Sequence, residues 1–223
     1  MINSLNTLRA IIWKDLIVEF RSKEIILPIL AFSCLTLIIF NFAIDTTRID
    51  IKYLAAGILW IVFIFTSILI LVRSSNIENQ NGNLQGLLLS PISREAIFFS
   101  KLISNFIFVS IIQIIITIVF IIIFNFSDFN LKFIPIILLG TFGIITIGNV
   151  FSIISNNTKS QEIILSVLLF PTITPVLIAS VEAINSIIGN NNDWLNQWIP
   201  LLIIFDTVFI IISPYAFNFI VEE

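Results

Sequence analysis

The residues of this chain that could do chemistry are few, and two of the most unusual are acids in apolar surroundings. Asp206 follows Ile203, Ile204 and Phe205, and Glu182 lies near the end of an earlier apolar run. Ionisable groups in such runs are costly and are candidates for substrate or ion contacts. Neither acid has a cation at a matching position, and Glu182 lies close to the predicted headgroup level. For Asp206, a structural hydrogen bond or water contact and a substrate role both stay open.

Several other chemistries are excluded by composition. Histidine is absent, Cys34 is the only cysteine and Met1 is the only methionine. One chain therefore builds no disulfide, no Cys/His zinc site and no imidazole-based catalysis. Gly82 and Gly86 are not followed by the lysine of a phosphate-binding loop, so nucleotide binding by that motif is excluded. We expect no catalytic residue, no metal site and no directly bound cofactor.

Six long apolar runs occupy most of the 223 residues, of which 58% are hydrophobic and 11% are charged. A lipid bilayer needs about 20 apolar helical residues per crossing, and a backbone inside lipid must satisfy its own hydrogen bonds. The sequence therefore predicts an all-α integral membrane protein with one domain over residues 1–223, comprising an interfacial helix over 1–24 and a six-helix bundle over 25–223. The predicted spans are residues 25–44, 53–72, 102–126, 133–155, 163–183 and 200–220.

The positions of the cations predict the orientation. Cytoplasmic connectors of membrane proteins are enriched in lysine and arginine, and this favours both termini in the cytoplasm. On that assignment the outer side holds only Arg48, Lys52 and Lys132. The cytoplasmic side holds Arg9, Lys14, Arg21, Lys23, Arg73, Arg94, Lys101 and Lys159.

Residues 3–23 predict an amphipathic helix in the plane of the membrane surface. Asp15 and Glu19 border its apolar stripe and are like charges four residues apart, which is mildly unfavourable. With Arg21 they are candidates for contacts with a protein partner, and a solvated face without a partner stays open. The apolar stripe comprises Leu5, Leu8, Ile12, Leu16 and Phe20, and the opposite face carries Asn3, Lys14 and Arg21.

The connector over residues 73–100 contains a second candidate contact. Leu84, Leu87 and Leu88 have the spacing of a short helix that lies in a groove of another protein. Pro91 ends this element, and Ser93 is expected to cap the next helix. The leucines could instead pack under the chain's own bundle. The candidate coupling residues are Glu78, Gly82, Leu84, Gly86, Leu87, Leu88 and Pro91.

The fourth and fifth predicted spans contain residues that favour close helix packing or helix bending. Pro171 and Pro175 each remove a backbone hydrogen bond and are candidate hinges. Small residues on one face of a span predict close helix packing, and the fourth span has Gly140, Gly143 and Gly148 on such a face. Residues 158–161 predict a capping box before the fifth span. A short interfacial helix is expected between residues 185 and 199, where Trp194 and Trp198 would lie at the headgroup level.

Taken in order, these residues resemble the CcmB family, the permease subunits of the ABC-type cytochrome c maturation complex. The resemblance covers nearly the whole chain, and Gln80 and Gln85 make its connector less acidic than is usual. It is carried by residues 13–16 and 19–24, residues 57–60, Glu78, Gly82, Leu84, residues 86–88, Pro91, Lys101, residues 140–143, Gly148, Glu162, Leu165, Phe170, Pro171 and residues 175–179.

The resemblance implies an ABC-2-type permease-like bundle in a bacterial inner membrane, or alternatively a mitochondrial one. It implies a CcmA-type ATPase docked on the cytoplasmic connector, CcmC- and CcmD-type membrane subunits and a CcmE-type haem chaperone. ATP would be bound by the ATPase, and haem would be the substrate that is exported or released with the chaperone. Because this chain has no histidine and no internal methionine, we expect haem-iron ligation on a neighbour.

Two other functions stay open. One is an ABC exporter permease for a lipid, polysaccharide or drug, which a genomic neighbourhood without cytochrome c maturation genes would favour. The other is a membrane scaffold that anchors a cytoplasmic protein without transporting anything. A scaffold needs no hinge, so replacement of Pro171 and Pro175 would leave its function intact.

Overall fold

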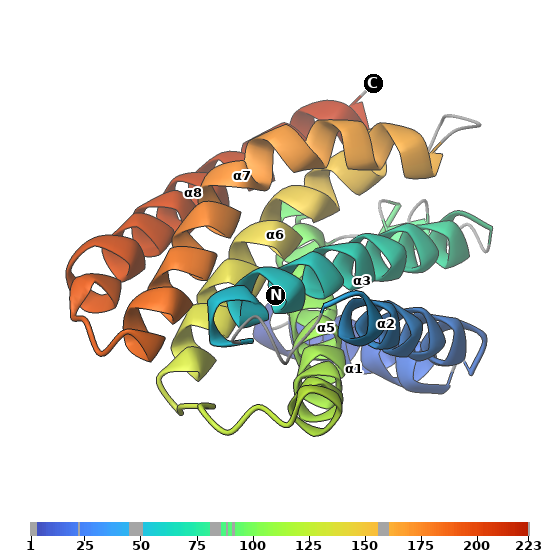
Figure 1. The fold of residues 1–223 in the computed structure, drawn as a ribbon. Coiled ribbons are helices and arrows are strands. Elements are labelled where there is room, and N and C mark those ends of the chain that lie inside the picture. The colour runs from blue at the N-terminus through green and yellow to red at the C-terminus, as the bar shows by residue number, and fades with distance from the viewer. Residues whose placement is uncertain are drawn as a thin grey trace.

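The chain folds into a bundle of long helices (Figure 1). The computed structural model describes residues 4–21, 23–44, 51–80, 86–87, 89–90, 92–155 and 161–222, and that part of the chain contains no strand. The predicted all-α class is confirmed. The helices are α1 (Ser4–Arg21), α2 (Lys23–Ala43), α3 (Lys52–Gln80), α5 (Arg94–Phe124), α6 (Phe133–Ser155), α7 (Gln161–Ile188), the π-helix η1 (Trp194–Trp198) and α8 (Ile199–Glu222).

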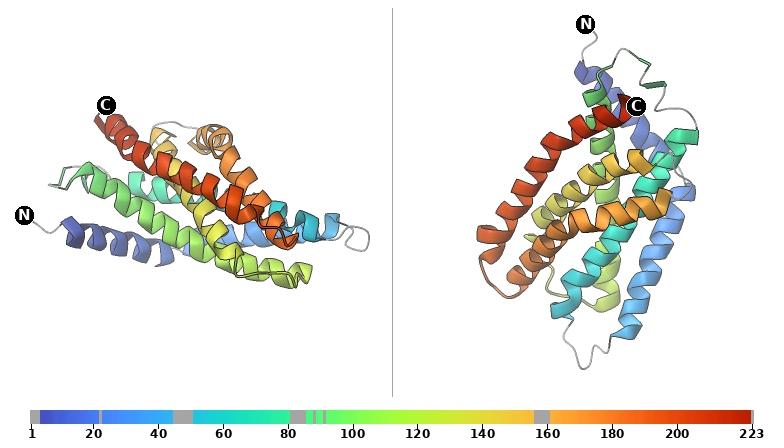
Figure 2. Two further views of the ribbon diagram at one scale, coloured as in Figure 1. Left: turned by 90° about the vertical axis from the view of Figure 1, so that its left-hand side faces the viewer. Right: turned by 90° about the horizontal axis from the view of Figure 1, so that it is seen from above.

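Six helices in the described part of the chain, α2, α3 and α5 to α8, are long and apolar enough to cross a membrane. This confirms the six predicted spans. The N-terminal end of α1, the C-terminal end of α3 and the C-terminal end of α8 lie together at one end of the bundle (Figure 2). The starts of α3 and α6 lie at the opposite end. We name these the predicted cytoplasmic end and the predicted outer end.

α3 and α5 extend into polar sequence beyond the apolar runs that predicted them. α3 continues to Gln80 and α5 begins at Arg94. A helix can leave the lipid and keep its backbone hydrogen bonds, and in polar sequence an apolar run no longer indicates that the helix continues. Ser93 caps α5 as predicted, and its hydroxyl accepts a hydrogen bond from the Ala96 N–H at 3.4 Å. The predicted capping box lies outside the described residues, which exclude 156–160.

The predicted separate helix over residues 185–199 is wrong. α7 continues to Ile188 because Ile187 is buried in the bundle, and the chain then reverses through Asn190 in a left-handed conformation. The segment from Trp194 to Trp198 is a π-helix that runs directly into α8. The tryptophan segment is therefore the first part of the last span.

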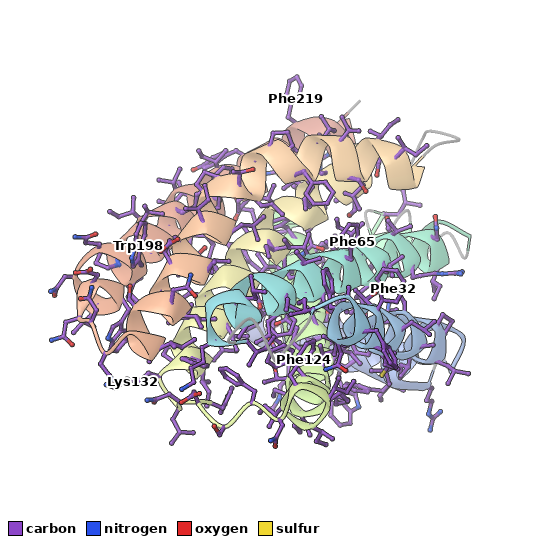
Figure 3. All side chains as sticks on the ribbon, viewed as in Figure 1. Phe32, Phe65, Phe124, Lys132, Trp198 and Phe219 are labelled. Atoms are coloured by element: carbon purple, nitrogen blue, oxygen red, sulfur yellow. The ribbon has the colours of Figure 1, made fainter. Side chains whose placement is uncertain are left out.

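α3 and α6 form the centre of the bundle, and α2 and α8 lie at its edge (Figure 1). In the apolar windows of these helices, 78% of residues are buried in α3 and 67% in α6, against 17% in α2 and 22% in α8. The exposed residues of the edge helices are large and apolar, as Phe42 and Phe219 illustrate, and Phe219 points away from the bundle (Figure 3). Such surfaces are expected where helices face lipid.

Candidate coupling site at the predicted cytoplasmic end

α1 lies along the first half of α5, and the two helices are side by side in both further views (Figure 2). Ile11 is buried on the face that α1 turns toward the bundle, and the Phe20 ring meets Phe108 of α5 edge-on with ring centroids 5.2 Å apart. Glu19 is only 4% exposed, whereas Trp13 is 67% exposed. The inward face therefore includes an acid and differs from the purely apolar stripe that the sequence predicts.

A polar network at this end explains why Glu19 can be buried. The Ser74 hydroxyl of α3 donates to Glu19 Oε1 at 2.9 Å and also lies 3.3 Å from Asn105 Oδ1 of α5. The Asn105 amide donates to Asn149 Oδ1 of α6 at 2.6 Å. We call these four residues the coupling network. It connects four helices that are far apart in the sequence.

The Ser74 hydroxyl has one proton and two acceptors within reach. It can direct that proton mainly to Glu19 on α1 or mainly to Asn105 on α5, and the shorter distance favours Glu19. Hydrogen bonds in an apolar interior are strong, and a group left without one is costly. A Ser74 hydroxyl turned from Glu19 to Asn105 would exchange one bond for the other.

Two small cavities adjoin Ser74, one on each side of the network. The first, of about 30 Å³, lies between α1, α3 and α5, and the second, of about 20 Å³, lies between α3, α5, α6 and α8. Each has room for about one water molecule. The first is lined by Lys14, Asp15, Val18, Glu19, Ser74, Ile77 and Ser104, and the second by Leu71, Ser74, Ser75, Phe98, Lys101, Asn105, Asn149, Ser152, Ile153 and Phe217.

The predicted partner-contact residues of α1 have different surroundings. Glu19 belongs to the coupling network, and Asp15 lies 3.0 Å from the Lys14 amine at the first cavity. Arg21 is exposed. Their contact with another protein stays a prediction.

The predicted coupling connector is described only in part. Gly82, Leu84, Leu88 and Pro91 lie outside the described residues, and Glu78 is described only as part of the α3 backbone. The described residues Gly86 and Leu87 lie at the predicted cytoplasmic end. Gly86 is exposed and Leu87 is half-buried.

Leu87 packs against a small apolar cluster made of Ile97, Phe98, Leu102, Val150 and Phe217. Its carbonyl accepts hydrogen bonds from the backbone N–H and the hydroxyl of Ser90, at 3.1 Å and 2.5 Å. Leu89, between them, is 89% exposed. For Leu87 the contact is thus with the chain's own bundle, and Leu89 is an exposed apolar residue that the helical spacing did not single out.

The glycines of α6 form a close-packed seam. A methyl group added at Gly140 would overlap the Trp60 ring of α3 and lie 2.6 Å from the Ser180 hydroxyl of α7. A methyl group at Gly148 would overlap Leu71 of α3, and one at Gly143 would lie 2.6 Å from Asp206 Oδ1 of α8. These three glycines therefore let α6 contact α3, α7 and α8 closely.

The remaining candidates lie along α7 and α8. Pro171 and Pro175 are inside α7, which stays helical over its whole length and bends along it (Figure 1).

The two acids of the apolar runs have different surroundings. Glu182 is exposed. Asp206 is 6% exposed, and neither of its carboxyl oxygens has a hydrogen-bond partner in the described part of the chain. That part also contains no group of three or more metal-ligating side chains.

Sequence reasoning missed Ser74, Asn105 and Asn149. A search for charged residues in apolar runs does not find them because they carry no charge. Asn105 and Asn149 nevertheless lie inside two predicted spans, and an amide there needs a hydrogen-bond partner. That requirement was the signal that could have identified them.

Comparison with known proteins identifies the family. A profile described as CcmB protein matches residues 6–223, which is nearly the whole chain and includes all the residues of the coupling network. No curated protein matches the chain. The chain therefore belongs to the CcmB protein family.

Proposed function

We propose that this chain is the membrane subunit through which a partner ATPase drives haem export, or release of the haem-loaded chaperone, in cytochrome c maturation. Membership of the CcmB family implies a permease subunit of a haem-exporting ABC system for this pathway. The six apolar helices make it a multi-pass membrane protein. The chain has no phosphate-binding loop, so the ATP would be hydrolysed on the partner.

The coupling network is the observation that carries this proposal. A movement imposed on α1 from outside reaches Ser74 of α3 through Glu19, and reaches Asn149 of α6 through Asn105. Buried hydrogen bonds between helices are directional, so the helices they join are held in a defined arrangement. Such a network suits a subunit that is moved by a partner at one end.

The α6 seam supports transmission beyond the network. Packed glycine contacts leave no space for α6 to shift without moving its neighbours. Gly148 meets Leu71 of α3, and Gly143 meets Asp206 of α8. A displacement of α6 at Asn149 would therefore reach α3, α7 and α8.

The proposed partners follow the family. A CcmA-type ATPase would dock at the predicted cytoplasmic end, where Leu89 is exposed, and CcmC- and CcmD-type subunits would share the membrane. A CcmE-type chaperone would receive or carry the haem on the outer side. The proposed location is a bacterial inner membrane, with the mitochondrial inner membrane as the alternative.

The test is co-purification with the ATPase after changes in the connector. Replacing Leu84, Leu87 and Leu88 with glutamate should abolish co-purification and leave membrane insertion intact. Leu131→Glu is the matched control, because Leu131 is 76% exposed at the predicted outer end and should keep the ATPase bound. Retained binding by the triple variant would contradict docking at this connector.

A further inference from the structure

The second cavity adjoins the coupling network and is lined by an amide group that is only half satisfied. Asn149 Oδ1 accepts a hydrogen bond from Asn105, whereas Asn149 Nδ2 is buried without a hydrogen-bond partner in the described part of the chain. The Asn149 side chain is 5% exposed and lines this cavity. A buried N–H group without an acceptor costs free energy and is rare in folded proteins. A group inside the cavity is therefore expected to accept this hydrogen bond.

The second cavity has the size and the polarity of a site for one water molecule. Its volume is about 20 Å³, and one water needs roughly 10–15 Å³ together with two to four polar partners. Cavities lined only by apolar groups stay dry, but this lining is mixed. Its polar members are Ser74, Ser75, Lys101, Asn105, Asn149 and Ser152.

Two oxygens of this lining can accept hydrogen bonds from a bound water. The Ser152 hydroxyl donates its own proton to the Asn149 carbonyl at 2.9 Å, so the lone pairs of its oxygen stay available. Asn105 Oδ1 has two lone pairs, and Ser74, at 3.3 Å, can use only one of them. A water that accepts a hydrogen bond from Asn149 Nδ2 therefore has an acceptor for each of its own two protons.

Water fits Asn149 in either orientation of its amide group. Turning the amides of Asn105 and Asn149 by 180° would preserve the bond between them and leave the oxygen of Asn149 without a partner instead of the nitrogen. Water can bond to either atom because it both donates and accepts, whereas an anion can only accept. A cation is disfavoured, because Lys101 lines the cavity and no acid is among its described lining residues.

We propose that the second cavity binds one water molecule, which bonds to Asn149 and becomes the fifth member of the coupling network. Ser152 and Asn105 are its acceptors when Asn149 Nδ2 is its donor. The water lies between α3, α5, α6 and α8, and Phe217 brings α8 to the same site. The site does not depend on the proposed function, because the water satisfies the amide whether or not an ATPase acts on the chain.

X-ray footprinting of the purified complex tests the site. Short X-ray pulses produce hydroxyl radicals from bound water, and these radicals oxidise the side chains next to it. Phe98 and Phe217 line the second cavity and are 1% and 0% exposed. Mass spectrometry should find both oxidised at least fivefold faster than Phe120, which is 0% exposed and lines neither of the two cavities beside Ser74. Equal oxidation rates at the three phenylalanines would overturn the proposal.

Variants that fill one cavity at a time locate the water. Ser152→Leu should displace it and lower the oxidation rates of Phe98 and Phe217 to the rate of Phe120. Ser104→Leu is the matched control, because Ser104 is also buried but lines the first cavity. This control should leave both rates unchanged. Unchanged rates at Phe98 and Phe217 in Ser152→Leu would overturn the proposal.

A density map of the unaltered complex tests the same site without any variant. At a resolution that shows ordered water, the map should contain one peak at hydrogen-bond distance, about 2.7–3.2 Å, from the Asn149 amide. Crystals grown with bromide in place of chloride distinguish water from an anion. An anomalous bromide peak beside Asn149, or a map without any peak there, would overturn the proposal.

Discussion

Asn105 is the central residue of the coupling network, since its two amide atoms face different helices. Its Oδ1 lies toward Ser74 of α3, and its Nδ2 donates to Asn149 of α6. An apolar replacement would leave two buried polar partners with fewer hydrogen bonds. Single substitutions in the network should therefore change both the free energy of unfolding and the formation of c-type cytochromes.

Replacement of Asn105 by leucine should destabilise the protein by about 1–2 kcal/mol, the usual cost of orphaned polar groups between membrane helices. It should also reduce c-type cytochrome formation while the ATPase stays bound. Thermal unfolding and the cytochrome content of a dependent strain measure the two effects. Gln113, another buried amide, bonds to Thr141 nearer the outer end, so Gln113→Leu is the matched control for stability alone. Equal loss of cytochrome in both variants would contradict a special role for the network.

Glu19 provides a second test at the residue scale. Glu19→Gln keeps an oxygen that can accept from Ser74, whereas Glu19→Ala removes it. We expect the glutamine variant to keep most of its activity and the alanine variant to lose most of it, with a stability loss of about 1–3 kcal/mol. Glu182→Gln, at an exposed carboxyl group, is the control for the loss of charge. An active Glu19→Ala variant would show that α1 is not coupled through this bond.

The α6 glycines can be tested against a glycine of α3. Gly140→Ala would drive a methyl group into the Trp60 ring, and overpacking of this kind costs about 1–3 kcal/mol. Gly57→Ala is the control, because an added methyl group there meets nothing within 4 Å. That change should leave stability unchanged or raise it by up to about 1 kcal/mol. Similar unfolding temperatures for the two variants would argue against a tight seam.

At the scale of helices, hydropathy predicted the spans well and their ends less well. The limits of α6 were predicted to the residue, because both ends of that helix coincide with the ends of its apolar run. α3 and α5 extend into polar sequence, where backbone hydrogen bonds and the Ser93 cap maintain the helix. Periodicity correctly predicted a helix within residues 3–23 but misjudged its inward face, since Glu19 is buried and bonds to a residue 55 positions away. Such a contact depends on tertiary structure and leaves no local pattern.

The two prolines of α7 test whether this helix must bend for the protein to function. Replacing Pro171 and Pro175 with alanine restores two backbone N–H groups, which should straighten and stabilise α7. We expect correct membrane insertion, normal ATPase binding and reduced c-type cytochrome formation. Pro28, in the first turns of α2, is the control position. Normal cytochrome formation in the α7 double variant would favour a scaffold over a subunit that moves.

At the scale of the whole molecule, the two ends of the bundle are held differently. At the predicted outer end, Lys52 and Asp128 form a 3.1 Å ion pair, and Lys132 lies 5.5 Å from the centre of the Trp194 ring. Lys132 and Trp198 mark this end in Figure 3. These contacts are solvent-accessible and connect surface segments, whereas the coupling network at the predicted cytoplasmic end is buried and joins four helices. Our proposal that the ATPase acts at the end that carries α1 rests on this buried network.

The ion pair between Lys52 and Asp128 should contribute little to the stability of the folded protein. Its side chains are 44% and 36% exposed, and exposed pairs stabilise proteins by about 0–1 kcal/mol. Asp128→Asn should therefore leave the unfolding temperature within about 3 °C of the original and leave cytochrome formation unchanged. A large loss of either would mean that the outer end also takes part in transmission.

We propose that a cytoplasmic ATPase moves this bundle through α1 and the connector between α3 and α5. The decisive experiment crosslinks cysteines at positions 87 and 89, in a Cys34→Ala background, in sealed vesicles of both orientations. We expect crosslinks to the ATPase from position 89, reagent access only from the cytoplasmic side, and crosslinks that change when ATP is added. Access from the outer side, or no companion protein within crosslinking distance, would contradict it.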